Sequence, residues 1–482
     1  MFAPVRVIIT AAVLVAAVAA GSTGANDFRL PEIGDSSGGA ISPDQERAIG
    51  ESLMRRLRQA LLIVEDPLVQ SYVDSLGYRL VSASDRAGAE FTFFVVNDSR
   101  INAFAAPGGY VGVNSGLILT SESESELAAV LAHEITHVTQ RHMARTYEAA
   151  GRQRLAAAVA LLAAILVGGQ SDQLAQAAVA TGAAASMQMQ LNFTRANERE
   201  ADRLGIRMLA EAGFDPTAMA RFFERMHRTG RLYGAGAPEF LSTHPVTTNR
   251  IAESESLARG LTRTENPEAH SYELMRARLR VLGSPDPAAA ENEFAETLAR
   301  NSFRDAVAER YGYALALLRN GKPDEARKQI TPLVEAAPDH LALTIAAARI
   351  DLAAGAVERG LERFREALLN YPNDYPLVFF YSEALLDAGE PERAREVLSE
   401  YLRNRTPDAA VHALYARAAG ASGHMGEAYR HQAEHYFLSG QTHAAIEQLS
   451  RAAELPELNF YEASQIEARL QELKTIALEE ER

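Results

Sequence analysis

The sequence predicts an α+β fold that is mostly α: a first domain with one small β-hairpin, then an all-α repeat domain. Three observations support this prediction. An aromatic and β-branched run near residue 91 is followed by a Pro-Gly-Gly turn, a long segment around residue 133 is helical in pattern, and glycines recur every 34 residues after residue 301. A chain of 482 residues has room for two or three domains.

The first residues predict an export signal. Arg6 precedes an apolar run over residues 7–20, which is shorter than the roughly twenty residues of a membrane span. Small residues follow, as at a signal-peptidase site between Ala19 and Ala25. We therefore expect residues 1–25 to be a Sec signal peptide and the rest to be exported to the periplasm. An uncleaved inner-membrane anchor is the alternative.

The segment after the signal predicts an arm and two helices. Residues 26–40 are rich in Gly and Ser and predict a loose arm. Ser42, Pro43 and Gln45 form a helix start, because Ser caps, Pro suits the first turn and Gln reaches back to the cap. That helix should run toward residue 62, and a second should span about residues 67–83.

A β-hairpin is predicted next. Residues 91–96 form one β-rich run, and residues 101–105 and 110–113 flank the turn Pro107-Gly108-Gly109. Ser121 and Glu124 match a capping box that starts a long helix.

That long helix carries the string His133-Glu134-Ile135-Thr136-His137, which reads H-E-x-x-H. Residues four apart share a helix face, so His133 and His137 can bind one zinc ion, with Glu134 close enough to reach a water on it. Such an ion activates the water, and Glu134 moves its protons. His142 lies five residues beyond His137 and should point to another side of the helix, so we interpret it as structural.

A second helix offers a third ligand. Glu198 and Asp202 are four residues apart in a segment with helical spacing. A Glu often completes a two-histidine zinc site, and a carboxylate one turn on can accept the free imidazole N–H. We therefore assign Glu198 to the metal and Asp202 to a supporting contact. The alternative is a solvated acidic face that also includes Glu200.

Two Ala-rich stretches lie between these helices, at residues 155–168 and 173–189. We expect a helical hairpin that packs on the helix with the zinc motif. A membrane hairpin, or a mobile lid with an apolar face, remains open.

The loop around His244 is a further chemical cluster. Pro245 disfavours a helical conformation at His244 and favours an extended loop that could reach the metal. His244 then either stabilises the oxyanion of the reaction or occupies the open zinc position and holds the enzyme idle. Arg250 should tie this loop to an acidic partner.

The second half repeats with a period of 34 residues. The positions Gly321, Gly355, Gly389 and Gly423 are each 34 apart, and a small residue follows each after five positions. This pattern is typical of tetratricopeptide repeats, which stack helix pairs into a solenoid with a concave binding surface. A charged helix over residues 464–481 should cap the solenoid.

Four motifs resemble one known family. The strings NAFAAPGGYVGVNSGLI, HEITHVTQRH, NEREADRLG and LSTHPVTTNRI occur in that order, and LPEIGDSSGGAIS precedes them. Together they resemble the zinc peptidase (gluzincin) family of HtpX and the CAAX prenyl proteases, in particular its periplasmic branch with tetratricopeptide repeats. The resemblance covers nearly the whole mature chain and implies a zincin-type metalloprotease domain.

This resemblance implies an endopeptidase with one zinc ion on His133, His137 and Glu198, and with Glu134 as general base. It also implies that His244 and Arg250 line the cleft. An extended substrate should pair with the edge strand, so Asn102, Ala103 and Phe104 are expected cleft residues. The expected substrates are unfolded or misassembled outer-membrane β-barrel proteins. The alternative is a repeat-based chaperone or assembly adaptor whose protease is normally held inactive.

Composition narrows the partners. The formal net charge is −15, which argues against nucleic acid, and there is no cysteine for disulfides or thiolate ligands. We expect the repeats to bind the outer-membrane β-barrel assembly machinery, and a peripheral association with a membrane remains an open alternative. The predicted division is residues 1–25 (signal), 26–265 (peptidase), 266–300 (connecting helix or linker) and 301–482 (repeats).

Overall fold

The computed structural model describes residues 42–60, 63–145, 195–233, 238–262, 269–405, 408–456 and 458–480. The predicted signal peptide, the loose arm and the Ala-rich stretches at 155–168 and 173–189 lie outside these residues. No helix among the described residues is long and apolar enough to cross a membrane.

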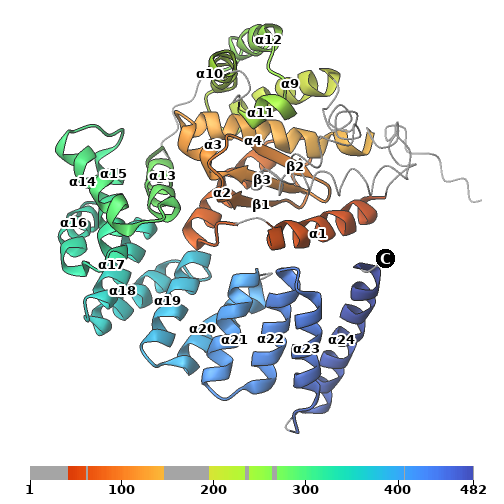
Figure 1. Ribbon diagram of the computed structural model, residues 1–482, viewed down its shortest axis with the longest axis vertical. Helices are drawn as coiled ribbons and strands as arrows, with labels where there is room; N and C mark the ends of the chain where they lie inside the picture. The colour runs from red at the N-terminus through yellow and green to blue at the C-terminus, as the bar shows by residue number, and fades with distance from the viewer. Residues whose placement is uncertain are drawn as a thin grey trace, which may run out of the picture.

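The N-terminal half is a small sheet enclosed by helices (Figure 1). Its strands are β1 (Thr92–Val96), β2 (Ala103–Ala106) and β3 (Tyr110–Asn114), in the order β1-β3-β2. β3 pairs in parallel with β1 and antiparallel with β2, so β2 is an edge strand. Its helices are α1 (Pro43–Ala60), α2 (Pro67–Ser82), α3 (Ser115–Thr120), α4 (Glu124–Thr139), α9 (Arg195–Glu211), α10 (Ala218–Tyr233), α11 (Glu239–Thr243) and α12 (Thr248–Ala258).

Alternation along the strands gives the sheet two apolar faces. Phe93, Val95 and Val113 belong to the main core with α2 and α4, whereas Phe94 and Phe104 pack with α1 residues. The predicted capping box of α1 forms: Gln45 N donates to Ser42 Oγ at 3.2 Å, and Ser42 N donates to Gln45 Oε1 at 3.0 Å.

The cap of α4 differs from its prediction. Ser123 is the N-cap, with its side chain accepting from Glu126 N, while Ser121 ends α3 and donates its hydroxyl to Leu117 O. Two overlapping Ser-x-x-Glu matches exist in this stretch, and the prediction chose the earlier one. The correct start still places the H-E-x-x-H string in the last two turns of α4.

The second half is a solenoid of antiparallel helices that curves beside the N-terminal half (Figure 1). Its helices are α13 (Ala269–Gly283), α14 (Pro287–Ala299), α15 (Ala306–Arg319), α16 (Pro323–Ala336), α17 (Leu341–Ala353), α18 (Val357–Asn370), α19 (Tyr375–Asp387), α20 (Pro391–Asn404), α21 (Ala409–Ala421), α22 (Met425–Leu438), α23 (Thr442–Ala453) and α24 (Phe460–Glu480).

The 34-residue period corresponds to one pair of helices with a glycine at the turn between them. The four glycines Gly321, Gly355, Gly389 and Gly423 have φ between +72° and +87° and end the first helix of each pair. Gly360 takes the place of the usual alanine because a Cβ there would lie 2.7 Å from Leu352 Cγ and 2.9 Å from Ala348 O.

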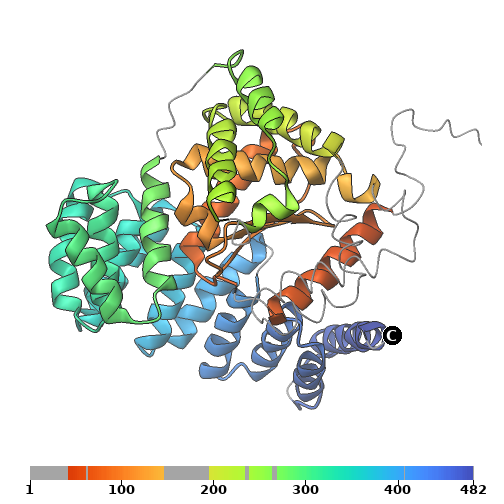
Figure 2. The same cartoon turned by 45° about the horizontal axis from the view of Figure 1, so that its top comes forward.

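The two halves touch at both ends of the solenoid. Near its start, Arg278 on α13 forms a buried bidentate pair with Asp66, at 2.7 and 2.6 Å. Near its end, α1 lies beside α24 (Figure 2), where Arg55 pairs with Glu480 at 3.0 Å and Arg58 donates to Leu438 O at 2.8 Å. The solenoid is thus anchored to the N-terminal half.

Candidate metal centre

Helix α4 presents three of the candidate residues from its last two turns. His133, Glu134 and His137 are all buried, with at most 1% of each residue exposed. The Nε2 atoms of the two imidazoles are 3.0 Å apart, as the spacing of four residues predicts.

Helix α9 brings Glu198 to these imidazoles. Glu198 Oε2 lies 3.5 Å from His133 Nε2, and Oε1 lies 3.5 Å from His137 Nε2. Helix α9 packs along α4, and Gly205 lies where a Cβ would come within 3.4 Å of the α4 backbone at Ala132 and His133. The close packing of the two helices places the carboxylate against the histidines.

His244 enters from the loop after α11. The helix ends at Thr243, and the backbone of His244 is no longer helical, with φ −126° and ψ 82°. Its Nδ1 lies 3.3 Å from His133 Nε2 and 3.2 Å from Glu198 Oε1. The ligand atoms of His133, His137, Glu198 and His244 all lie within 4.8 Å of one another.

The spacing of these atoms fits a metal ion. Zinc–nitrogen bonds of about 2.0–2.1 Å in a tetrahedron imply ligand atoms roughly 3.4 Å apart. The distances among His133 Nε2, His137 Nε2, Glu198 Oε and His244 Nδ1 given above run from 3.0 to 3.5 Å. Three nitrogens and a carboxylate that converge in this way can hold one metal ion.

Two residues support this cluster from outside. Asp202 Oδ1 lies 3.0 Å from His133 Nδ1, the nitrogen that faces away from the cluster. Arg250 on α12 forms a bidentate pair with Asp202, with both distances 2.7 Å, and lies 2.9 Å from Glu198 Oε2. Arg250 also donates to Pro245 O at 2.9 Å, so it joins both carboxylates to the loop of His244.

Electrostatics keep these carboxylates ionised. Burial disfavours the charged form of Glu198, but His244 and His133 outweigh burial and hold the pKa of Glu198 well below its ordinary value. Burial likewise opposes ionisation of Asp202, but hydrogen bonds from Arg250 and His133 lower its pKa. Burial lowers and the two carboxylates raise the pKa of His133, with a net rise to about 9. An ionised Glu198 is the form that a metal binds.

Two of the predicted site residues, Glu134 and Asn102, have buried side-chain oxygens without a hydrogen-bond partner among the described residues. Both carboxylate oxygens of Glu134 are buried without one, although His244 Nε2 lies 3.3 Å from Glu134 Oε1. The Oδ1 atom of Asn102, which is 2% exposed, is also unsatisfied. Buried polar atoms without partners are costly unless a ligand or water serves them, so both groups are available to a bound substrate or water.

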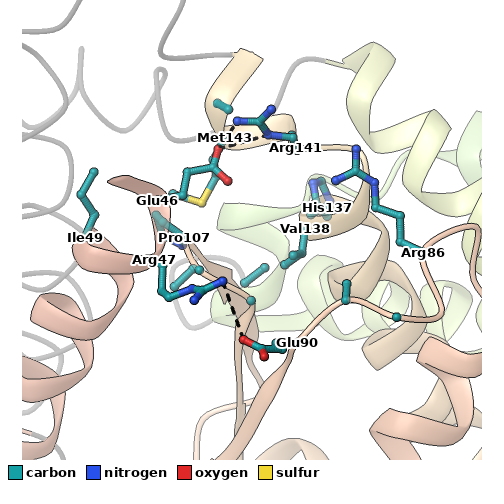
Figure 3. Close-up of a pocket in the computed structure, with 17 residues that line it drawn as sticks. Glu46, Arg47, Ile49, Arg86, Glu90, Pro107, His137, Val138, Arg141 and Met143 are labelled. Atoms are coloured by element: carbon teal, nitrogen blue, oxygen red, sulfur yellow. Dashed lines mark hydrogen bonds and ion pairs between the residues drawn. The ribbon is translucent and has the colours of Figure 1, made fainter. Parts of the chain in front are cut away.

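A cavity of about 420 Å³ lies between the edge strand, α1 and the end of α4 (Figure 3). Its walls include His137, Ala105 and Pro107. Arg141 and Glu46 pair across it at 3.0 Å. The cavity therefore runs from His137 along Ala105 and Ala106 of the edge strand. The predicted cleft residues Asn102, Ala103 and Phe104 are buried and are not among the residues that line it.

The prediction that His142 points away from the cluster is wrong. It assumed that α4 continues through residue 142. Helix α4 ends at Thr139, and Arg141 has φ +50°, so the chain turns back. His142 Nδ1 consequently lies 2.9 Å from His137 Nδ1, and its Nε2 lies 3.2 Å from Glu200 Oε2. Nothing in the sequence marked this turn, because a non-glycine residue in the left-handed region is uncommon.

The fold and this cluster define a class: a metallopeptidase with an appended helical repeat domain. The model for Peptidase family M48 matches residues 67–258, and a Tetratricopeptide repeat model matches residues 351–418. Among the described residues, the cluster of two α4 histidines, Glu198 and His244 lies inside the first match.

Relatives match over nearly the whole chain. The sequence is 34% identical to the Beta-barrel assembly-enhancing protease of Escherichia coli K12 over 93% of this chain and 91% of that protein. The protein of the same name from Yersinia pestis is also 34% identical, over 93% and 92%. Mitochondrial metalloendopeptidase OMA1 of Schizosaccharomyces pombe is 34% identical over 38% of this chain and 51% of its own length.

The chain therefore belongs to peptidase family M48 and is a metalloendopeptidase. The family, the mostly helical α+β fold class and the enzyme class predicted from the sequence are confirmed.

Proposed function

We propose that the protein is a periplasmic zinc endopeptidase that cleaves misassembled outer-membrane β-barrel proteins and promotes their assembly. The observation that carries the catalytic part is the convergence of two α4 histidines, Glu198 and His244 within 4.8 Å. The substrate class rests on similarity along 93% of the chain to proteases named for β-barrel assembly, and the compartment on the signal-like first 25 residues.

His133, His137 and Glu198 are the proposed ligands of one zinc ion per chain, and Asp202 holds the imidazole of His133. When bound, zinc polarises the scissile carbonyl and lowers the pKa of water. Glu134 is the general base: its buried oxygens, which lack hydrogen-bond partners among the described residues, can take the proton of the attacking water and pass it to the leaving amine.

The edge strand is the proposed site for the substrate backbone. Asn114 N donates to Asn102 O, so in this register the backbone groups of Ala103 and Ala105 point away from β3. An extended peptide can pair with them whatever its sequence, as a protease for many unfolded chains requires. Asn102 would lie at the start of this edge, whereas the ring of Phe104 packs against Phe94 and α1 and supports the strand from its other face.

We propose that His244 restrains the enzyme. Its Nδ1 stands at the fourth position of the ligand cluster, and its Nε2 faces Glu134 at 3.3 Å. In this position the imidazole would take the place of the attacking water. It would also engage the carboxylate of Glu134, the proposed general base. Arg250 and Pro245 hold the loop in place. The rival role, an oxyanion donor, requires the ring to leave the ligand position.

The same observation favours a second candidate function. A protease held idle could act mainly as a chaperone or adaptor, with the solenoid binding β-barrel proteins or their assembly machinery. We propose that the peptidase domain ends near residue 265. Residues 266–300, which carry α13 and α14, then join it to the repeat domain. A Glu134→Gln variant separates the candidates, because an adaptor keeps its function when cleavage is lost.

Metal removal tests the proposal. Zinc per chain is measured after purification, and cleavage of an unfolded β-barrel protein is followed before chelation, after it, and after zinc is restored. We expect about one zinc per chain and cleavage that disappears and returns with it. Glu198→Ala should lose most of its zinc, whereas Asp202→Ala should bind about 10–100-fold more weakly. Full zinc occupancy in Glu198→Ala would refute the ligand assignment.

A further inference from the structure

The turn after α4 carries a feature that the catalytic assignment does not use. Arg141 has φ +50°, in the left-handed region that side chains other than Gly, Asn and Asp rarely adopt. Such strain persists where surrounding contacts enforce it, and it gathers at functional sites. Here the guanidinium of Arg141 is held by Glu46 at 3.0 Å, and the turn brings His142 back under His137.

His142 is 0% exposed and bridges two groups. On one side its Nδ1 is 2.9 Å from Nδ1 of His137. On the other side its Nε2 is 3.2 Å from Glu200 Oε2, a carboxylate that Arg145 also contacts at 3.1 Å. His142 thus connects a proposed metal ligand to a negative charge at the surface.

Proton positions along this connection are set by the metal ligand. When Nε2 of His137 faces a metal it carries no proton, so a neutral His137 bears its proton on Nδ1. That N–H donates to His142 Nδ1, which therefore lacks a proton. His142 then carries its own proton on Nε2 and donates it to Glu200. Each hydrogen bond in this order supports the next.

We propose that His142 and Glu200 are positioning residues of the metal centre: they fix the ring and the tautomer of His137, as Asp202 does for His133. This inference deepens the proposed function and rests on its metal centre. Neither residue touches the metal or the substrate, and both act through His137.

Helix geometry explains why His137 needs an intermediary. Glu198, Glu200 and Asp202 all lie near the start of α9. Glu198 and Asp202 share the face that meets α4, but Glu200 lies roughly 200° round the helix from Glu198 and cannot reach the same point. The imidazole of His142 spans the remaining distance. The first two turns of α9 therefore supply one ligand and both supporting carboxylates.

A pair of isosteric substitutions tests this role. Asn in place of His142 keeps an acceptor near the Nδ1 position, whereas Leu has the same shape without a polar atom. The zinc dissociation constant is measured by competition with a chromophoric chelator, and the visible spectrum of the cobalt-substituted protein reports ligand geometry. We expect His142→Leu to bind zinc about 100-fold more weakly, and His142→Asn, which keeps the acceptor for His137 but loses the contact with Glu200, to bind zinc about tenfold more weakly.

A second variant keeps the test valid if His142→Leu does not fold. Glu200 has a side chain that is 30% exposed, so Glu200→Ala should fold and should weaken zinc binding by about tenfold. The matched control on the same helix is Arg199→Ala, which removes a surface pair with Glu253 at 3.7 Å and should leave zinc affinity unchanged.

Equal zinc affinity in His142→Leu and His142→Asn, or wild-type affinity in Glu200→Ala, would overturn the proposal and leave His142 as packing. Failure of the wild-type protein to bind zinc would be a different result, because it would remove the proposed metal centre itself together with this inference.

Discussion

At the residue scale, the site gathers several buried charged side chains whose charges do not cancel. Glu134, Glu198 and Asp202 are each at most 5% exposed, and Arg250 is the buried guanidinium that pairs with two of them. With the imidazoles neutral, the form in which they bind a metal, this set retains two uncompensated negative charges when all three carboxylates are ionised. Without a metal, a proton on His133, whose pKa is raised to about 9, offsets one of them. Buried charge of that size is strongly unfavourable unless a cation balances it. A divalent ion at the four-residue cluster would supply the balance.

The role of His244 gives the clearest prediction at this scale. If its imidazole occupies the fourth ligand position and blocks Glu134, His244→Ala should raise the cleavage of an unfolded protein. If it donates a hydrogen bond to the oxyanion, the same change should lower turnover by roughly 10²–10³-fold. The measurement is turnover by wild type and His244→Ala at equal zinc content. A large drop would contradict the restraining role.

At the scale of elements, periodic patterns were predictable from the sequence. The hairpin around Pro107-Gly108-Gly109 and the 34-residue repeat were both predicted correctly, because each depends on residues close together in the chain. The start of α4 was two residues off, since the two Ser-x-x-Glu matches are equivalent locally. The predicted direction of the His142 side chain was wrong for a related reason. The left-handed turn at Arg141 depends on contacts between residues far apart in the chain, including the pair with Glu46.

The junction of α2 and α13 gives a prediction about stability. Asp66 caps α2 by accepting from Val69 N, and it also accepts two hydrogen bonds from the buried Arg278. Arg278→Met leaves the Asp66 carboxylate buried without its cation, so it should lower the free energy of unfolding by about 3–5 kcal/mol. Adding Asp66→Asn removes that charge and keeps a good cap.

The double variant Asp66→Asn/Arg278→Met should consequently be more stable than Arg278→Met alone. Urea unfolding of the single and double variants measures the difference. If the double variant were the less stable of the two, the buried charge would not be the cause of the loss.

At the scale of the whole molecule, one hydrophobic core joins the peptidase half to the solenoid. A single cluster of buried side chains runs from the sheet and α4 to Ala428 on α22. The contacts that orient the two halves link residues far apart in the chain, such as Asp66 with Arg278, 212 positions later. Local patterns carry no information about such pairs, so the arrangement of the halves could not be predicted from the sequence, whereas the repeats themselves could.

An acidic residue near this junction predicts a pH dependence. Burial raises the pKa of Asp74 to about 6; a hydrogen bond from Gln70 opposes the rise, and nearby Asp408 on the solenoid side adds to it. The unfolded chain has a pKa near 4, so the folded state binds the proton more tightly, and Asp74 makes the protein less stable as pH rises from about 4 to about 6. Above about pH 6 to 7, the loss of stability caused by Asp74 no longer changes with pH.

Asp74→Asn should therefore stabilise the protein by up to about 3 kcal/mol at about pH 7, and the gain should shrink to about a third at about pH 4.5. Asn keeps an acceptor for Gln70, whose Nε2 lies 3.0 Å from Asp74 Oδ2. Thermal unfolding of both proteins across this range is the check. A gain that does not change with pH would show that the carboxylate is not the source.

The most direct test of the account measures peptide-bond cleavage by Glu134→Gln. The account assigns metal binding to His133, His137 and Glu198, and proton transfer to Glu134 alone. Glu134→Gln should therefore retain about one zinc per chain and cleave an unfolded β-barrel protein at least about 10²-fold more slowly than wild type at equal zinc content. Cleavage at the wild-type rate by a zinc-loaded Glu134→Gln protein would contradict the account.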